Sequence, residues 1–375
     1  MRHEPKLDGL RGLAILLVVF SHGGDRLGLA GPVGEVYRTA VGMGWVGVDL
    51  FFVLSGYLIT GILLDTAGRP GWLTSFYARR TLRIFPAYYA WLLLLLVVIP
   101  RIGWFDAFHS WRLPEHVSSL WYWLYASNWA FAWNAAWLHP ILSLTWSLAI
   151  EEQFYAVWPW VVRRVDAARL ARVCAVGVGV ALVLRVALVA ADVHPIAVFV
   201  MTPCRFDGLL AGAFIACVSR APGGREALLR AARWLLPAAA ALLLAVVAAI
   251  RAGLTPLGPR GELAMAPAMQ TVGLSAVALL FGALLVRVAF GTARWTGAFA
   301  NPLLRTFGKY SYALYLTHTF VGGFFVIFVF NPFGRPWWAA LASYPLEWAA
   351  QLAVAMLSWV LLESHFLRLK RRFAV

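Results

Sequence analysis

The sequence predicts an all-α polytopic membrane protein with about ten transmembrane helices and both termini in the cytoplasm. Of its 375 residues, 62% are hydrophobic and only 13% are charged, whereas a soluble domain carries about 25% charged residues. Apolar runs recur along the chain, among them 238–250 and 272–288. Arginines gather in short clusters between these runs, as they do in loops that stay on the cytoplasmic side during insertion.

Eleven apolar segments are candidates for spans. They lie near residues 10–28, 43–64, 85–101, 119–134, 142–162, 173–191, 204–219, 234–250, 268–287, 309–330 and 346–363. The segment 119–134 differs, because it is crowded with tryptophan and contains Asn128 and Asn134. That composition suits the membrane interface or a re-entrant piece. Omitting it leaves ten spans.

The distribution of cations supports this arrangement. With ten spans, 23 Lys and Arg residues fall on the side of the termini and seven on the opposite side, so we expect the termini in the cytoplasm. The formal net charge of +15 is thereby explained by topology, and we expect no nucleic-acid partner. All loops are short, so we expect one membrane domain over 1–375 and no additional soluble domain. Cys174, Cys204 and Cys217 have no ligand spacing, so we expect no metal.

The first predicted helix contains two polar residues whose presence in a membrane span a catalytic role would explain. Arg11 and His22 are eleven residues apart, about three helical turns, so they share a face and differ in depth by about 16 Å. Arg11 would lie at the inner boundary and His22 near mid-membrane. A histidine there suits proton transfer near neutral pH. The alternative is a packing histidine bonded to a neighbouring helix.

Two arginines precede the third span. Arg80 and Arg83 are three residues apart and would share a helical face at the cytoplasmic mouth. Two guanidinium groups there could hold phosphates. The alternative is ordinary anchoring of topology by positive charge.

A polar stripe lies in TWSLAIEEQFY. Ser147, Glu151 and Tyr155 recur at steps of four and so line one helical face. Glu151 could orient a histidine, hold a cation or bind a hydroxyl, or form a structural salt bridge. We take Trp146, beside Ser147, as a further substrate-binding candidate.

Further polar groups lie in other spans. Tyr315 and His318 share a face with Ser311, and His318 reaches the depth of His22, which suggests one shared cavity, although a packing role is an equal alternative. Asp49, near the outer end of the second span, and Arg205 and Asp207, at the outer end of the sixth, either pair with one another or touch an outer substrate. Structural pairing is slightly favoured.

These motifs together resemble the acyltransferase 3 family. The resemblance rests on LDGLRGLAILLVVFSH, GVDLFFVLSGYLI, the Arg80-x2-Arg83 step, TWSLAIEEQFY, RFDGLLAG and GKYSYALYLTH, which occur in the expected order.

The resemblance implies a ten-helix bundle in a bacterial inner membrane. It implies transfer of an acyl group, most often acetyl, from cytoplasmic acetyl-CoA or another acyl-CoA to a hydroxyl of an envelope or exported carbohydrate. Arg11, Arg80 and Arg83 would hold the coenzyme A phosphates. His22 would act as base or acyl carrier, with Glu151 or His318 orienting it, and Ser147 and Tyr155 would bind acceptor or stabilise the oxyanion.

The main alternative is a polytopic transporter or flippase of a carbohydrate or small molecule, because mid-membrane polar groups also mark transport pathways. Against it, the sequence has no inverted repeat. The acceptor and the oligomeric state stay open.

Overall fold

The computed structural model describes residues 4–23, 27–101, 112–259, 261–330 and 337–373. Helices account for all its regular structure, with no strand in these ranges. The α-helices are α1 (Pro5–His22), α2 (Gly31–Met43), α3 (Val46–Thr66), α4 (Trp72–Leu93), α5 (Leu120–Trp123), α6 (Ser127–Asn134), α7 (Thr145–Arg164), α8 (Ala167–Ala190), α9 (Pro195–Val200), α10 (Thr202–Val218), α11 (Gly224–Arg251), α12 (Leu274–Phe290), α13 (Pro302–Phe325), α14 (Trp337–Ser358) and α15 (Ser364–Leu369).

Within those ranges, eight helical segments are long and apolar enough to cross a membrane. They are Gly31–Thr66, Trp72–Arg101, Ala167–Ala190, Pro195–Val218, Gly224–Arg251, Met269–Phe290, Pro302–Val329 and Ala342–Phe373. Each contains or overlaps one of the predicted spans, which confirms the all-α polytopic class. The other two predicted spans correspond to α1 and α7, which are less apolar because they carry polar residues of the candidate site. At 18 and 20 residues, both are long enough for the roughly 30 Å hydrocarbon core.

The segment 119–134 forms two short helices, α5 of four residues and α6 of eight. Neither is long enough to cross a bilayer. Gln153 on α7 fixes this segment, because its Nε2 donates to the Tyr125 carbonyl (2.8 Å) and to Asn128 Oδ1 (3.0 Å). Asn128 Nδ2 in turn donates to Thr202 Oγ1 at 2.8 Å. Asn128 therefore binds this segment to the bundle, whereas Asn134 Nδ2 donates to the Ala130 carbonyl of its own helix.

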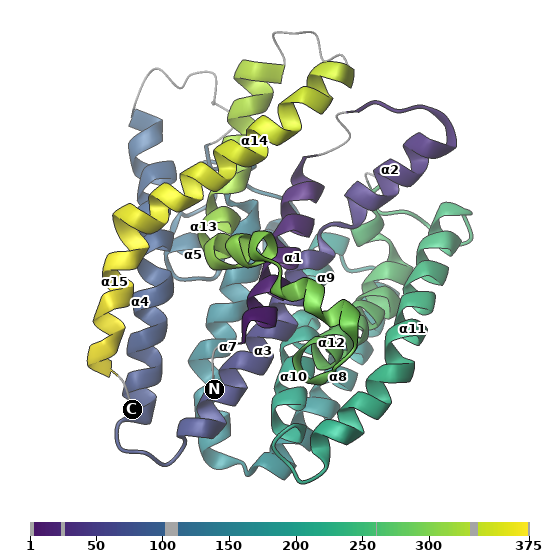
Figure 1. Ribbon diagram of the computed structural model, residues 1–375. Coiled ribbons are helices and arrows are strands. Elements are labelled where there is room, and N and C mark those ends of the chain that lie inside the picture. The colour runs from purple at the N-terminus through teal and green to yellow at the C-terminus, as the bar shows by residue number, and fades with distance from the viewer. Residues whose placement is uncertain (1–3, 24–26, 102–111, 260, 331–336, 374–375) are drawn as a thin grey trace.

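The helices stand side by side with α1, α3 and α7 in the interior, and both ends of the described chain lie toward the same end of the bundle (Figure 1). α15 packs on α4 at one flank, and α11 packs on α12 at the other. The number of ten spans and the cytoplasmic position of the termini stay predictions.

Close helix crossings depend on glycine. A Cβ atom at Gly12 of α1 would overlap the Leu304 carbonyl oxygen of α13, and one at Gly308 of α13 would overlap the Asp8 carbonyl oxygen of α1. Likewise, a Cβ at Gly212 of α10 would overlap the α3 backbone. Since association between helices in lipid depends on close packing, such small residues favour these crossings.

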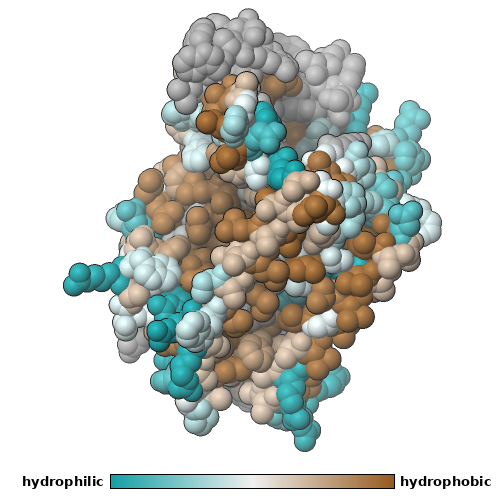
Figure 2. Space-filling model, turned by 90° about the vertical axis from the view of Figure 1, so that its right-hand side faces the viewer, coloured by the Kyte–Doolittle hydropathy of each residue, from teal (hydrophilic) through white to brown (hydrophobic). Residues whose placement is uncertain are grey.

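The outer helices present apolar side chains, as a lipid-facing surface requires. On α8 and α11 these include Val173, Val176, Val180, Val183, Leu235, Leu242 and Leu244. Figure 2 shows the flank that includes α11, where hydrophobic residues spread over the middle and hydrophilic residues gather at the lower end. This distribution fits a bundle surrounded by lipid at mid-height.

Candidate active site

The crossing of α1 and α13 brings two histidines together. Gly12 and Gly308 mark the contact, and ten residues further along each helix stand His22 and His318. The two helices run in parallel, so equal steps reach equal depth. The imidazole centroids lie 4.8 Å apart with the rings at 76°. The predicted approach of these residues is thus present in the structure.

Both imidazoles are held by backbone carbonyls of their own helices. His22 Nδ1 lies 2.9 Å from the Val18 oxygen, and His318 Nδ1 lies 3.0 and 2.9 Å from the oxygens of Leu314 and Tyr315. A carbonyl only accepts, so Nδ1 is the donor in each ring and Nε2 of the neutral ring carries the lone pair. His22 is exposed to cavities, whereas His318 is buried.

An inner cavity of about 480 Å³ is rich in cations. Its lining includes Arg11, Arg69, Arg79, Arg80, Arg83 and Lys370. One carboxylate, that of Asp65, is also present, and Arg220 Nε lies 2.8 Å from it. All six cations come from regions that the sequence placed on the side of the termini. The arrangement attracts a ligand with several negative charges.

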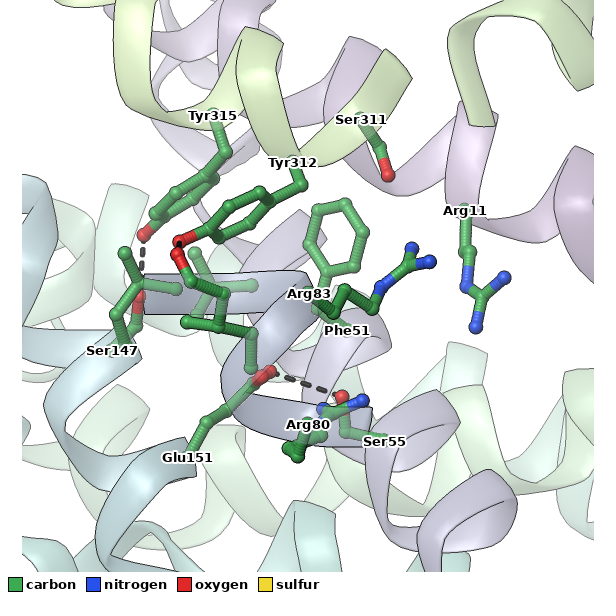
Figure 3. A pocket seen from close by; sticks show the side chains of 13 residues that line it. Arg11, Phe51, Ser55, Arg80, Arg83, Ser147, Glu151, Ser311, Tyr312 and Tyr315 are labelled. Carbon is green, nitrogen blue, oxygen red and sulfur yellow. Dashed lines mark hydrogen bonds between the residues drawn. The ribbon is translucent and has the colours of Figure 1, made fainter. Parts of the chain in front are cut away.

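A narrow central chamber of about 90 Å³ continues from this cavity. Arg11, Arg80 and Arg83 line both spaces, together with Phe51 and Ser55. In Figure 3 the three guanidinium groups lie near one another, with Glu151 beside Ser55 and Ser147 beside Tyr315. The Ser147 and Tyr315 hydroxyls are 2.5 Å apart. This pair, from α7 and α13, narrows the passage.

A larger outer cavity, of about 870 Å³, lies beyond the chamber. Val48 and Tyr315 line both spaces. The outer cavity also contains His22, two arginines, two serines and an aromatic wall. These residues are Arg38, Arg251, Ser21, Ser143, Trp45, Trp137, Trp146 and Phe199. The three spaces therefore form a series, with the smallest in the middle.

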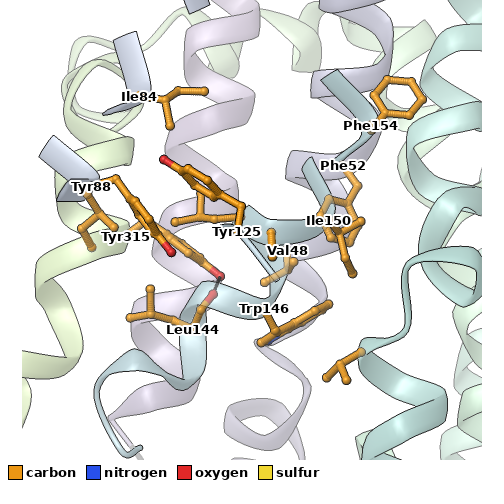
Figure 4. Close-up of a cluster of buried hydrophobic side chains, with 14 of the residues drawn as sticks. Val48, Phe52, Ile84, Tyr88, Tyr125, Leu144, Trp146, Ile150, Phe154 and Tyr315 are labelled. Carbon is orange, nitrogen blue, oxygen red and sulfur yellow. Dashed lines mark hydrogen bonds between the residues drawn. The ribbon is translucent and has the colours of Figure 1, made fainter. Parts of the chain in front are cut away.

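The wall beside the chamber is tightly packed. Figure 4 shows Val48, Ile84, Leu144 and Tyr315, which line cavities, among the buried side chains of one hydrophobic cluster. Such packing holds side chains in single positions. The lining of the central chamber comes from helices rather than from loops.

Glu151 is hydrogen-bonded to Ser55 and Tyr155 rather than to the histidines. Its Oε1 accepts from Ser55 Oγ (3.1 Å) and its Oε2 from Tyr155 Oη (2.6 Å). The Arg80 guanidinium lies 3.9 Å from the centre of the Tyr155 ring. No hydrogen bond joins Glu151 to His22 in the described part of the chain, so the suggestion that Glu151 orients His22 has no contact to support it. The ring of His318 occupies that neighbouring position instead.

Asp49 is engaged in a buried ion pair. Arg205 Nη2 lies 2.7 Å from Asp49 Oδ1, with both side chains almost fully buried. The Arg205 guanidinium also lies 5.3 Å from the centre of the Trp146 ring, which lines the outer cavity. Asp49 lines none of the three cavities. Of the two roles that the sequence left open, the structure provides the structural pairing.

Several residues that line the cavities were not predicted from the sequence. Ser55 and Tyr312 line the central chamber, Lys370 lines the inner cavity, and Trp45 lines the outer cavity. Ser55 stood in the motif GVDLFFVLSGYLI, and Lys370 was one of the 23 cations on the side of the termini. Which residues of a segment face a cavity depends on how the helices pack. Among the described residues, no group of three or more His, Cys, Asp or Glu side chains is placed to hold a metal ion.

Part of this chain is similar in sequence to bacterial O-acetyltransferases. A "Putative peptidoglycan O-acetyltransferase YrhL" of Bacillus subtilis is 38% identical over 172 residues, which are 42% of this chain and 23% of that protein. The peptidoglycan O-acetyltransferase OatA of Listeria monocytogenes is 36% identical over 167 residues, which are 42% of this chain and 24% of that protein. The matches thus span about a quarter of the relatives' length. No solved structure matches this chain.

The family comparison covers far more of the chain. The acyltransferase 3 model, described as an acyltransferase domain, matches residues 4–364. That range includes every residue that lines the three cavities except Lys370. This chain belongs to the acyltransferase 3 family of membrane proteins.

Proposed function

We propose that this protein transfers an acyl group, acetyl in the first instance, from cytoplasmic acyl-CoA to a hydroxyl of an envelope or exported carbohydrate. The observation that carries the proposal is the series of three cavities, which leads from a cluster of cations through a narrow chamber to the cavity of His22. A bacterial inner membrane is the setting in which such a series would join a coenzyme A pool to the envelope.

The inner cavity suits the coenzyme A part of the donor. Coenzyme A carries a diphosphate and a 3′-phosphate, and arginine binds phosphate through paired N–H groups. Arg83 has no hydrogen bond or ion pair to another described residue, so its donors are available to a ligand. The long pantetheine arm would extend from there into the central chamber.

The outer cavity suits a sugar. Tryptophan faces and a few hydroxyl and charged groups around a cavity of this size are typical of binding sites that orient a polar ring. The O-acetyltransferases among the relatives favour acetyl as the acyl group, and their peptidoglycan acceptor favours a cell-wall glycan.

His22 would carry the chemistry between the two substrates. Its Nε2 lone pair can accept the proton of the acceptor hydroxyl during direct attack, or attack the thioester carbon and carry the acyl group. The hydroxyls of Ser147 and Tyr315 lie where the chamber meets the outer cavity, and Ser147 Oγ is suited to stabilise the developing oxyanion. Tyr155 and Glu151 would instead hold the Arg80 guanidinium in position to bind acyl-CoA.

The test of the reaction uses purified protein in lipid, labelled acetyl-CoA and a soluble glycan acceptor. We expect His22→Ala to lower acetyl transfer at least about 100-fold, since general acid–base or nucleophilic catalysis contributes on that scale. Undiminished transfer by His22→Ala would remove this residue from the chemistry. Translocation of the glycan without any acetyl transfer would favour the transporter instead.

The test of the donor site uses Arg80→Ala and Arg83→Ala. We expect each to raise the KM for acetyl-CoA by roughly tenfold or more, because a charge-assisted hydrogen bond contributes about 1.5–3 kcal/mol. Arg172→Ala is the matched control, since Arg172 is an exposed cation of α8 outside these cavities. An unchanged KM in both variants would return Arg80 and Arg83 to the role of topology anchors.

A further inference from the structure

The active site contains two basic nitrogens where one would serve direct transfer. His22 and His318 each donate from Nδ1 to a backbone carbonyl, so each presents Nε2 with a free lone pair. Direct transfer requires one base to remove the hydroxyl proton. An acyl-enzyme route requires two groups, because an acylated imidazole nitrogen has no lone pair left.

The environment of His318 is unusual for a packing residue. Its side chain is 1% exposed, and its Nε2 is buried without a hydrogen-bond partner among the described residues. Buried polar atoms nearly always have partners, so one without a partner calls for an explanation, of which a catalytic role is one. The anchored ring therefore leaves its basic atom unused in the resting protein.

A fourth cavity, of about 300 Å³, joins the two histidines. It is lined by both rings and by Glu347 and Gln351 of α14. Gln351 Nε2 donates to Glu347 Oε1 at 2.9 Å and to the His318 carbonyl at 3.4 Å. The Glu347 carboxylate thus lines the same space as the two imidazole rings.

We propose that transfer proceeds through an acyl group on His22, and that His318 is the base for the second step. This proposal rests on the proposed function. In the first step, His22 Nε2 forms a bond to the thioester carbon, the C–S bond breaks and the electron pair leaves on sulfur as thiolate. The acylated ring is cationic, and its Nδ1–H remains on the Val18 carbonyl.

The second step restores the enzyme. His318 Nε2 accepts the proton of the acceptor hydroxyl, and the oxygen forms the ester bond to the acyl carbon. The C–N bond breaks, and its electron pair returns to His22 Nε2. The proton then passes from His318 to the thiolate of coenzyme A. The sum is hydroxyl plus thioester giving ester plus thiol.

The experiment separates the two steps with His318→Asn. The asparagine amide N–H can replace Nδ1–H toward the Leu314 and Tyr315 carbonyls, whereas the Nε2 base is lost. In single-turnover measurements with labelled acetyl-CoA, we expect about one equivalent of coenzyme A released, label retained on the protein, and transfer to glycan at least about 100-fold slower. Peptide mass spectrometry should place the label on His22, and His22→Ala should retain none.

The matched control is His194→Ala, which replaces an exposed histidine at the start of α9 and should transfer at the rate of the unchanged protein. Wild-type transfer by His318→Asn would overturn the proposal. The proposal would also be overturned if His318→Asn lost coenzyme A release and glycan transfer to the same extent and retained no label.

A second measurement needs no variant, since rapid quenching of the unchanged protein should trap label on His22 before glycan is modified. If the unchanged protein turned over without such label, the two-step route would fail while the proposed function stood. If it released no coenzyme A and transferred nothing, the proposed function itself would fail.

Discussion

The orientation of the His22 ring is set by a carbonyl four residues earlier on its own helix. Since the Val18 oxygen accepts from Nδ1 at 2.9 Å, the ring keeps one orientation and directs its basic nitrogen away from the helix backbone. Metal-binding and catalytic histidines are commonly held in this way, through the ring nitrogen opposite the one that binds or reacts. From the sequence we predict that His22 lies near mid-membrane, and that depth stays a prediction; the sequence gave no indication of the tautomer.

The buried pair of Asp49 and Arg205 leads to a prediction about stability. We expect Asp49→Ala to lower the free energy of unfolding by about 3–5 kcal/mol, because it leaves the Arg205 charge buried and unpaired. Thermal unfolding in detergent measures this. Asp166→Asn is the control, since asparagine caps a helix as well as the exposed Asp166 does. If Asp49→Ala unfolded like the unchanged protein but had a raised KM for glycan, Asp49 would be a substrate contact after all.

Among the elements, the contact of α1 with α13 decides whether the site is assembled. We expect Gly12→Ala to reduce acetyl transfer by at least tenfold, because the added methyl overlaps the Leu304 carbonyl and must move the helices apart. Since the histidines stand ten residues above this crossing, a small tilt there separates their rings.

Gly179→Ala provides the comparison for Gly12→Ala. Gly179 lies within α8, where an added Cβ meets no atom within 4 Å, so this change should leave transfer unaltered. The assay is initial rate per folded enzyme, with folding checked by gel filtration in detergent. Equal rates for Gly12→Ala and the unchanged protein would mean that the crossing tolerates extra volume and does not position the histidines.

How far the sequence predicted the site depends on whether a feature belongs to one helix or to several. Shared faces, such as that of Ser147, Glu151 and Tyr155, follow from periodicity within a helix and were predicted. The contact of Tyr315 with Ser147, and the choice between the two roles left open for Asp49, depend on the order of helices in the bundle, which hydropathy does not determine. The polar residues that made α1 and α7 candidates for catalysis also lower their hydropathy, so neither is among the eight segments that are long and apolar enough to cross a membrane.

At the scale of the whole molecule, the opposite ends of the cavity series should face opposite sides of the membrane. We expect Arg69→Cys, at the inner cavity, to react with an impermeant maleimide only after cells are permeabilised, and Arg251→Cys, at the outer cavity, to react in intact cells. The native cysteines Cys174, Cys204 and Cys217 are buried, so background labelling of the unchanged protein should be low. Labelling of Arg69→Cys from outside would reverse the orientation and place the cation cluster away from the coenzyme A pool.

The narrow chamber between the two larger cavities has a consequence for the cell as well as for the reaction. An open aqueous channel through this protein would short-circuit the proton gradient across the membrane. With Ser147 and Tyr315 in contact at the constriction, the chamber of about 90 Å³ would hinder the passage of a hydrated ion. In the reaction proposed above, an extended acyl thioester would enter this chamber, so that the acyl group would leave the cytoplasm while the coenzyme and the membrane potential are both retained.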